Sequence, residues 1–303
     1  MEQQYSHSDF EIVGENYILD EIEVVKEKGF KKALKEKPYI SIGVLLIIIL
    51  GCIFPRVITK LDPAYMDLSN INIAPNSTFY FGTDSLGRDI FSMVWYGGRI
   101  SLIIGILATV ISTTIAVIYG SISGIASELV DDMMMRFTEI VLSIPSILII
   151  IFIQAMIGKA NPVSISIVIG ITSWMNISKI VRSEVRQIRN NEYIWVARCT
   201  GGKFFYILRR HLFPNFISSI MFMVVTNVGI AIGIESTLSF LGIGLPLEII
   251  SWGSMLSLSE KALLSNYWWI ILIPGIFLVT TLVCITNIGN YIRKKNNKEF
   301  SNL

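Results

Sequence analysis

The sequence predicts an all-α polytopic membrane protein with six transmembrane helices, and two observations support this fold class. Hydrophobic residues make up 52% of the 303-residue chain and charged residues only 16%, whereas a soluble domain carries roughly 25% charged residues. The apolar residues also gather in separate blocks of about the 20 residues that a helix needs to cross a bilayer. The chain therefore has the composition and the spacing of a multi-pass membrane protein.

Six apolar blocks give the expected spans. The first block follows 37 mostly polar residues, so it is not the apolar core of a secretory signal, which lies within about the first 20 residues. Arg136 and Glu139 dilute the third block, while Pro145 and Pro274 predict bends in the third and sixth spans. The blocks cover residues 39–54, 100–125, 133–157, 163–180, 216–234 and 267–288.

The positions of Lys and Arg orient these spans. If the N-terminus is cytoplasmic, 19 of the 25 Lys and Arg residues lie on the cytoplasmic side, as the positive-inside rule requires. The expected topology is therefore N-in and C-in, and Tyr267, Trp268 and Trp269 begin the last span at the outer interface. The expected organisation is a basic cytoplasmic tail (1–37), a transmembrane domain (38–292) with extracytoplasmic loops 56–99 and 239–266 and a cytoplasmic loop 184–215, and a cytoplasmic tail (293–303).

Several classes of function find no support in the sequence. The net charge of +2 does not indicate a nucleic-acid partner. Three scattered cysteines and two histidines match no metal-ligand spacing. The pairs Gly158-Lys159 and Gly202-Lys203 lack the other residues of a phosphate-binding loop. We therefore expect a non-catalytic chain that binds no metal, nucleotide or other cofactor itself.

One polar segment has more internal pattern than a simple connection needs. Within EYIWVARCTGGKFFYILRRHLFPN (192–215), Tyr193, Val196 and Ala197 have the spacing of one helical face. Gly201 allows a sharp bend, and Pro214 is expected to end a second helix before the fifth span. The pattern predicts a helix–bend–helix projection that docks into a groove on a partner, although an ordinary positively charged loop fits the sequence equally well.

This loop resembles the EAA loop of ABC importer permeases, and residues 28–292 resemble the C-type permease subunit of the dipeptide/oligopeptide/nickel family. Three further segments carry the resemblance: FGTDSLGRDIFSMVWYGGRISL (81–102), RRHLFPN (209–215) and ESTLSFLGIGLPLEIISWGSML (235–256). The chain departs from the family pattern at Glu-Ala-Ala, where it has Trp195-Val196-Ala197. No role for a glutamate at that position carries over.

The resemblance implies a type I ABC importer permease in the bacterial plasma membrane. Its expected partners are the lipid bilayer, a second homologous permease that completes the pore, two cytoplasmic ABC ATPases that carry ATP and magnesium, and an extracytoplasmic substrate-binding protein. Residues 192–214 would dock into a cleft of an ATPase. The coupling residues that it implies are Glu192, Tyr193, Trp195, Val196, Ala197, Arg198, Gly201 and Pro214.

The cargo implied by the resemblance is an oligopeptide or dipeptide, with nickel or a metal complex as the alternative. The spans contain no His and few carboxylates, which favours a peptide over a metal ion. Two alternatives from other classes are an ion-coupled secondary transporter, which would need carboxylates as ion sites, and a non-transporting membrane scaffold.

Three residues are candidates for the pore or an outer gate: Arg99, Asn227 and Glu235. Ionisable groups near membrane depth are functional candidates by default, but Glu235 could instead form a structural ion pair with Arg99 or Arg88. Asn227 could line a polar path or join two helices by hydrogen bonds. The segment GTDSLGRD (82–89) is expected to be a turn held by its own polar side chains, with a docking surface for an external protein as its functional interpretation.

Overall fold

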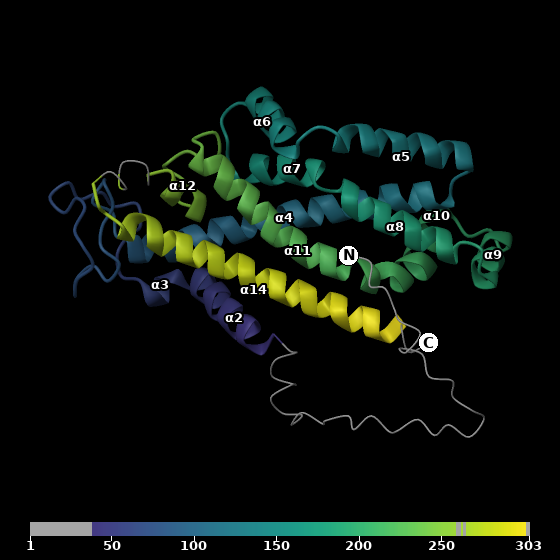
Figure 1. Ribbon diagram of the computed structural model, residues 1–303, viewed down its shortest axis with the longest axis horizontal. Coiled ribbons are helices and arrows are strands. Elements are labelled where there is room, and N and C mark those ends of the chain that lie inside the picture. The colour runs from purple at the N-terminus through teal and green to yellow at the C-terminus, as the bar shows by residue number, and fades with distance from the viewer. Residues whose placement is uncertain (1–37, 259–261, 263–264, 301–303) are drawn as a thin grey trace, which may run out of the picture. The chain divides into compact units, whose positions relative to one another are not determined.

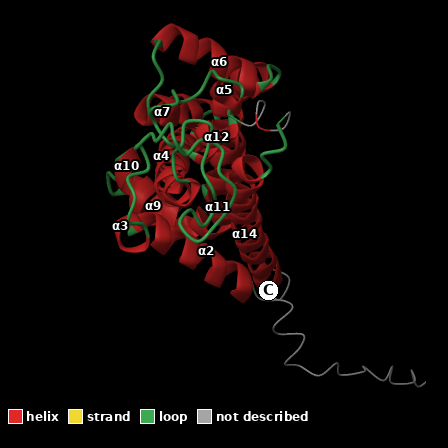
Figure 2. Ribbon diagram, turned by 90° about the vertical axis from the view of Figure 1, so that its left-hand side faces the viewer, coloured by secondary structure: helices red, strands yellow, loops and turns green. Residues whose placement is uncertain are grey.

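The computed structural model describes residues 38–258, 262 and 265–300, and the expected basic segment before residue 38 lies outside them. Within the described residues the regular structure is helical (Figures 1 and 2), apart from an isolated bridge between Thr83 and Asp89. The helices are α2 (Tyr39–Ile53), α3 (Pro55–Ile58), α4 (Ile90–Ile125), α5 (Glu128–Leu142), α6 (Ser146–Ile157), α7 (Pro162–Thr172), α8 (Met175–Ile188), α9 (Glu192–Cys199), α10 (Phe204–Ile207), the π-helical turn η2 (Leu208–Leu212), α11 (Phe213–Phe240), α12 (Trp252–Leu256) and α14 (Trp269–Phe300).

The long helices have the length and composition of membrane spans. Three continuous helices qualify, at Ile90–Ile125, Phe204–Phe240 and Trp269–Lys295, and two bent pairs, α5–α6 and α7–α8, bring the number to as many as five. Helix α2 is apolar but has only 15 residues. The all-α polytopic class is thus confirmed, while the count of six spans and their orientation stay predictions.

Several span boundaries differ from the expected ones. Helix α4 begins at Ile90, ten residues before the predicted start, because the Asp89 side chain accepts a hydrogen bond from the Ser92 amide and caps the helix. Pro145 does break the third span, where α5 and α6 meet at 85°. Helix α14 instead runs unbroken through Pro274 and continues to Phe300, past the predicted boundary at residue 292.

Pro214 does not end a helix, contrary to the prediction. The chain is helical from Phe204 to Phe240, and the five residues before α11 form the π-helical turn η2. Proline removes one amide donor and its ring crowds the carbonyl four residues earlier. A π turn, with its wider i→i+5 spacing, precedes Pro214 at the start of α11. The last part of the predicted cytoplasmic loop, from Phe204 on, and the fifth span therefore form one helical rod.

Helix α4 crosses the whole bundle and contributes to three apolar clusters. One cluster joins α2, α4, α12 and α14, a second joins α4, α8, α9 and α11, and a third joins α4, α6, α7 and α11. Small residues let α8 approach closely, since a Cβ added at Gly120 or Gly124 would lie 2.8 Å from Val181 Cβ or 2.7 Å from Val185 Cβ. This packing fixes α8, and with it the start of the segment that leads to α9.

Candidate functional site

The segment 192–215 forms the helix–bend–helix shape that its sequence predicts. Helix α9 ends at Cys199, and Gly201 adopts a positive φ of 84°. The Gly202 amide donates to the Ala197 carbonyl at 2.9 Å, which is the long hydrogen bond of a Schellman motif. Helix α10 then starts at Phe204, and α9 lies at one end of the bundle (Figure 1).

The residues predicted to form one docking face of α9 lie on two different faces of the helix. Ala197 is only 7% exposed and packs with Ile194, at 1%, against Ile207 and Leu208 of the same chain. Ala197 is therefore part of the core, and its assignment to the docking face is corrected. Ile194, three residues before it, was missed, although an i, i+3 apolar pair in a polar loop could have indicated an inward face.

The outward face of α9 consists of large apolar side chains. Tyr193, Trp195 and Val196 are 40%, 56% and 62% exposed, and Glu192 beside them is also exposed. The Arg198 side chain lies outside the described part of the structure. Aromatic side chains at the centre of a surface patch are typical anchors of protein–protein interfaces. We call Tyr193, Trp195 and Val196 the α9 patch.

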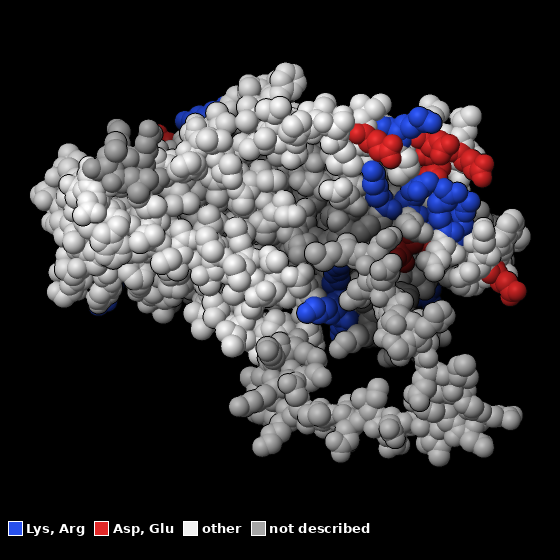
Figure 3. Space-filling view, in the orientation of Figure 1, with Lys and Arg blue, Asp and Glu red and all other residues white. Residues whose placement is uncertain are grey.

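A buried carboxylate joins three helices near the α9 end, and no sequence pattern indicated it. Asp131 of α5 accepts hydrogen bonds from Arg182 Nε at 2.6 Å, from Arg186 Nη1 at 2.7 Å, and from the Ser123 hydroxyl of α4. Figure 3 shows acidic and basic side chains gathered at this end, while the opposite half of the same face carries few charges. The Asp131 cluster is thus the main polar link between α5 and α8.

Glu235 is fully buried, and the predicted ion pair with Arg99 or Arg88 is wrong. Arg99 is exposed, and Arg88 binds Asp84 with its Nε 2.8 Å from the Asp84 carboxylate. Glu235 instead accepts hydrogen bonds from serine hydroxyls, and no described Lys or Arg forms an ion pair with it. Its four partners are Ser101 at 3.2 Å, Ser236 at 3.4 Å, Ser239 at 3.0 Å and Ser251 at 2.8 Å.

Three of these serines relay backbone amides to the carboxylate. The Ser239 hydroxyl accepts from the Leu245 amide at 3.1 Å, and the Ser251 hydroxyl accepts from the Ser254 amide at 3.0 Å. The Ser101 hydroxyl of α4 accepts from the Trp252 amide at 3.2 Å. Each of these hydroxyls in turn donates a hydrogen bond to the Glu235 carboxylate. One carboxylate thus holds residues 245–254 against α4 and α11. We call this arrangement the Glu235 hub.

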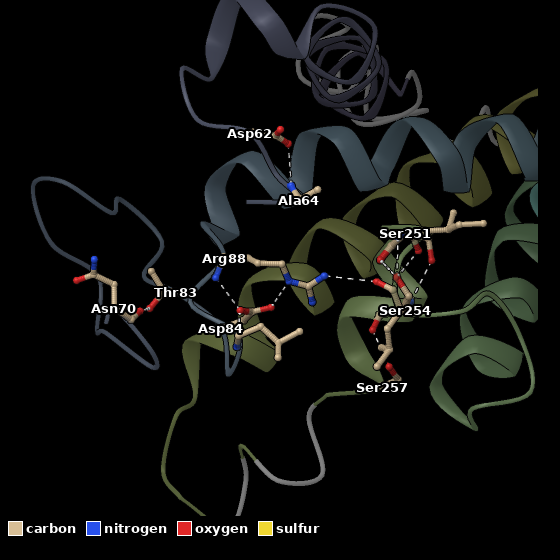
Figure 4. Close-up of polar contacts among 12 residues, drawn as sticks. Asp62, Ala64, Asn70, Thr83, Asp84, Arg88, Ser251, Ser254 and Ser257 are labelled. Atoms are coloured by element: carbon tan, nitrogen blue, oxygen red, sulfur yellow. Dashed lines mark hydrogen bonds and ion pairs between the residues drawn. The ribbon is translucent and has the colours of Figure 1, made fainter. Parts of the chain in front are cut away.

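The turn at 82–89 is held by its own polar groups, as predicted, and it also contacts α14. The Asp84 carboxylate accepts from the Leu86 and Arg88 amides, and the Thr83 hydroxyl donates to the Asn70 carbonyl at 2.6 Å. Figure 4 shows Arg88 also reaching toward the segment before α12, where its Nη1 lies 3.4 Å from the Leu247 carbonyl.

Trp269 closes this end of the structure. Its indole donates to the Thr83 carbonyl at 3.1 Å and the ring is 7% exposed. The Trp269 ring is therefore packed inside the protein, while Trp268 beside it is half exposed. Their position at the outer membrane interface stays a prediction. In the neighbouring loop, hydrogen bonds from Ser69 and Asn70 lower the pKa of Asp67.

Asn227 joins two helices and also reaches a cavity. Its Nδ2 lies 2.9 Å from the Ser112 hydroxyl and 3.4 Å from the Thr109 hydroxyl, both on α4. The same side chain lines a cavity of ≈ 260 Å³ between the α5–α6 break, the α7–α8 bend and α11. The two interpretations left open by the sequence are thus compatible for this residue.

The fold defines a multi-pass, all-helical membrane protein with a helix–bend–helix projection at one end. A family model described as "Binding-protein-dependent transport system inner membrane component" matches residues 116–298, which is more than half of the chain. The chain belongs to this family. It is a multi-pass inner membrane protein and a non-catalytic permease component of an ABC transporter.

Curated relatives agree with this assignment over most of the chain. The dipeptide transport system permease protein DppC of Bacillus subtilis is 36% identical over 223 residues, or 74% of this chain and 69% of that protein. The oligopeptide transport system permease protein OppC of the same organism is 36% identical, with 84% and 83% covered. OppC of Haemophilus influenzae is 36% identical, with 75% and 73% covered.

Proposed function

We propose that this chain is the permease subunit of an ATP-driven, receptor-dependent importer of dipeptides or oligopeptides. It would form half of the translocation pore with a second, homologous permease. An extracytoplasmic binding protein would deliver the peptide, and two cytoplasmic ATPases would bind and hydrolyse ATP. Relatives named as dipeptide and oligopeptide permeases, at 36% identity, support the substrate class.

The α9 patch is the observation that carries the coupling role. It presents two aromatic rings and a valine to solvent on a helix whose other face is fixed in the core. A large apolar surface beside a charged cluster, at one end of the bundle, fits a groove on a soluble partner rather than lipid tails. The helical rod from Phe204 to Phe240 would carry a movement of α9 into the membrane.

Truncating the patch should uncouple transport without unfolding the permease. We expect Trp195→Ala to lower ATP-dependent peptide uptake by proteoliposomes at least tenfold, since central aromatic anchors contribute about 2 kcal/mol or more to an interface. Its membrane level and thermal stability should stay near wild type, because the side chain is 56% exposed. The measurements are uptake, ATP hydrolysis and co-purification of the ATPase.

Ile194→Ala is the matched comparison on the other face of α9. It should lower the free energy of unfolding by about 2–4 kcal/mol, as expected for truncation of a buried Ile. It should not selectively release the ATPase. If Trp195→Ala retains the ATPase and normal uptake, α9 is not the coupling element.

The metal-importing alternative receives less support from the cavity between α5–α6, α7–α8 and α11. Its lining offers hydroxyl, carboxamide, thioether and aliphatic groups but no imidazole, thiolate or carboxylate, and these last are the usual ligands of divalent metal ions such as nickel. We therefore place peptides first. Uptake by vesicles with and without ATP would separate this function from an ion-coupled transporter and from a scaffold.

A further inference from the structure

The cavity of ≈ 260 Å³ lies where two interrupted spans face α11. Pro145 and Ser146 border it at the break between α5 and α6, and Ser173 and Asn176 border it at the 46° bend between α7 and α8. Asn227 of α11 closes the opposite side. Both interruptions of the helical spans thus open onto one space.

Lipid tails cannot cover this face. Asn176 is exposed on the cavity side, and neither α6 nor α8 has a side-chain hydrogen bond at its N-cap, so their first amides lack such a partner. Hydrocarbon offers no hydrogen bonds, so irregular backbone at membrane depth is tolerated only against protein or a water-filled space. This face therefore lies inside the transport assembly, where it meets water, a partner or the cargo.

The polar groups of the lining are uncharged and have unused hydrogen-bonding capacity. Asn227 is 6% exposed and its Nδ2 is taken by α4, which leaves its Oδ1 free to accept, with no donor among the described residues. The Thr226 hydroxyl donates to its own helix at the Phe222 carbonyl, 2.9 Å away, and keeps acceptor capacity. Asn176 and the uncapped first amides of α8 supply donors.

We infer that this cavity is a subsite for the main-chain amide groups of a transported peptide, an inference that rests on the proposed function. An amide N–H matches the acceptors of Asn227 and Thr226, and an amide carbonyl matches the donors at the start of α8. Aliphatic lining residues such as Ile149, Met223 and Ile230 accept side chains without selecting one. A volume below the roughly 300–1,000 Å³ of whole-ligand pockets suits one or two residues of a longer chain.

The test compares a peptide with its ester analogue, in which one amide N–H is replaced by oxygen, in proteoliposomes that hold the complete transporter and its receptor. The cavity variants are Thr226→Val and Asn176→Ala. Their controls are Thr286→Val, which loses a similar hydroxyl bonded 2.8 Å from the Leu282 carbonyl, and Asn290→Ala, an exposed asparagine on α14. Because the receptor is the same in every sample, a change in the peptide-to-ester uptake ratio reports the permease.

We expect wild type and both controls to prefer the peptide. Each cavity variant should lower peptide uptake about three- to tenfold, as the loss of one hydrogen bond predicts. Thr226→Val, which removes an acceptor for the amide N–H, should also bring the ratio toward one. Asn176→Ala, which removes a donor to the carbonyl that peptide and ester share, should lower the uptake of both and leave the ratio near that of wild type. ATP hydrolysis should persist. A wild-type ratio for Thr226→Val, or wild-type peptide uptake for Asn176→Ala, would overturn the subsite while leaving the importer function in place. Absence of ATP-dependent peptide uptake by wild type would overturn both.

Discussion

Replacing Glu235 by alanine should destabilise the permease more than other single changes to its polar side chains. Four serine hydroxyls would lose their common acceptor, and three backbone amides would lose the relays that reach it. Leaving a buried polar group unsatisfied costs about 1–3 kcal/mol, so the total should be about 3 kcal/mol or more. Thermal unfolding of the purified protein and its level in the membrane measure the effect.

Two further variants at acidic positions make this result specific. Glu235→Gln should lose less, because the carboxamide keeps one acceptor oxygen while its NH₂ group faces serines that must turn to accept. Glu248→Ala removes an exposed acid from the same 245–254 segment and should leave stability unchanged. Wild-type stability of Glu235→Ala would show that the hub does not hold residues 245–254.

A second effect at a buried polar cluster is expected at Asp131. Asp131→Asn keeps the shape but removes the charge that Arg182 and Arg186 share, so two neighbouring cations are left without it. Breaking a buried pair costs about 3–5 kcal/mol, but these arginine side chains are 24% and 35% exposed, so water should reduce the loss to about 1–2 kcal/mol. Hydrogen exchange should rise selectively in α5.

Neighbouring residues provide the controls. Asp132→Asn changes an exposed acid one position away and should have no effect on α5. Arg186→Gln should be milder than Asp131→Asn, because Arg182 keeps two hydrogen bonds to the carboxylate. Equal rates of amide hydrogen exchange in α5 for Asp131→Asn and Asp132→Asn would show that Asp131 does not anchor α5 to α8.

The sequence could predict features whose causes are local. Apolar blocks marked the spans, Pro145 marked a real break, and Gly201 marked the bend, because each depends on a few consecutive residues. The Glu235 hub was not predictable in the same way, since Ser101 lies 134 residues away. From the sequence, a carboxylate near membrane depth is expected to pair with a cation. The fold shows that serine hydroxyls are the partners of Glu235 instead.

The inward face of α9 was missed for a related reason. Helical spacing grouped Ala197 with Tyr193 and Val196, but which side of a short helix meets the core depends on how the chain folds back at the bend. Proline rules likewise failed at Pro214, where a π turn precedes the proline and the helix continues.

Under the proposed coupling, the unbroken run from Phe204 to Phe240 would work as a lever. Its 37 residues span about 55 Å at 1.5 Å per residue. A tilt of about 5° at the end beside α9 would therefore move the opposite end by about 5 Å, roughly one helical turn. An outer mouth could thus be widened by a displacement at the ATPase that is itself far smaller than the cargo.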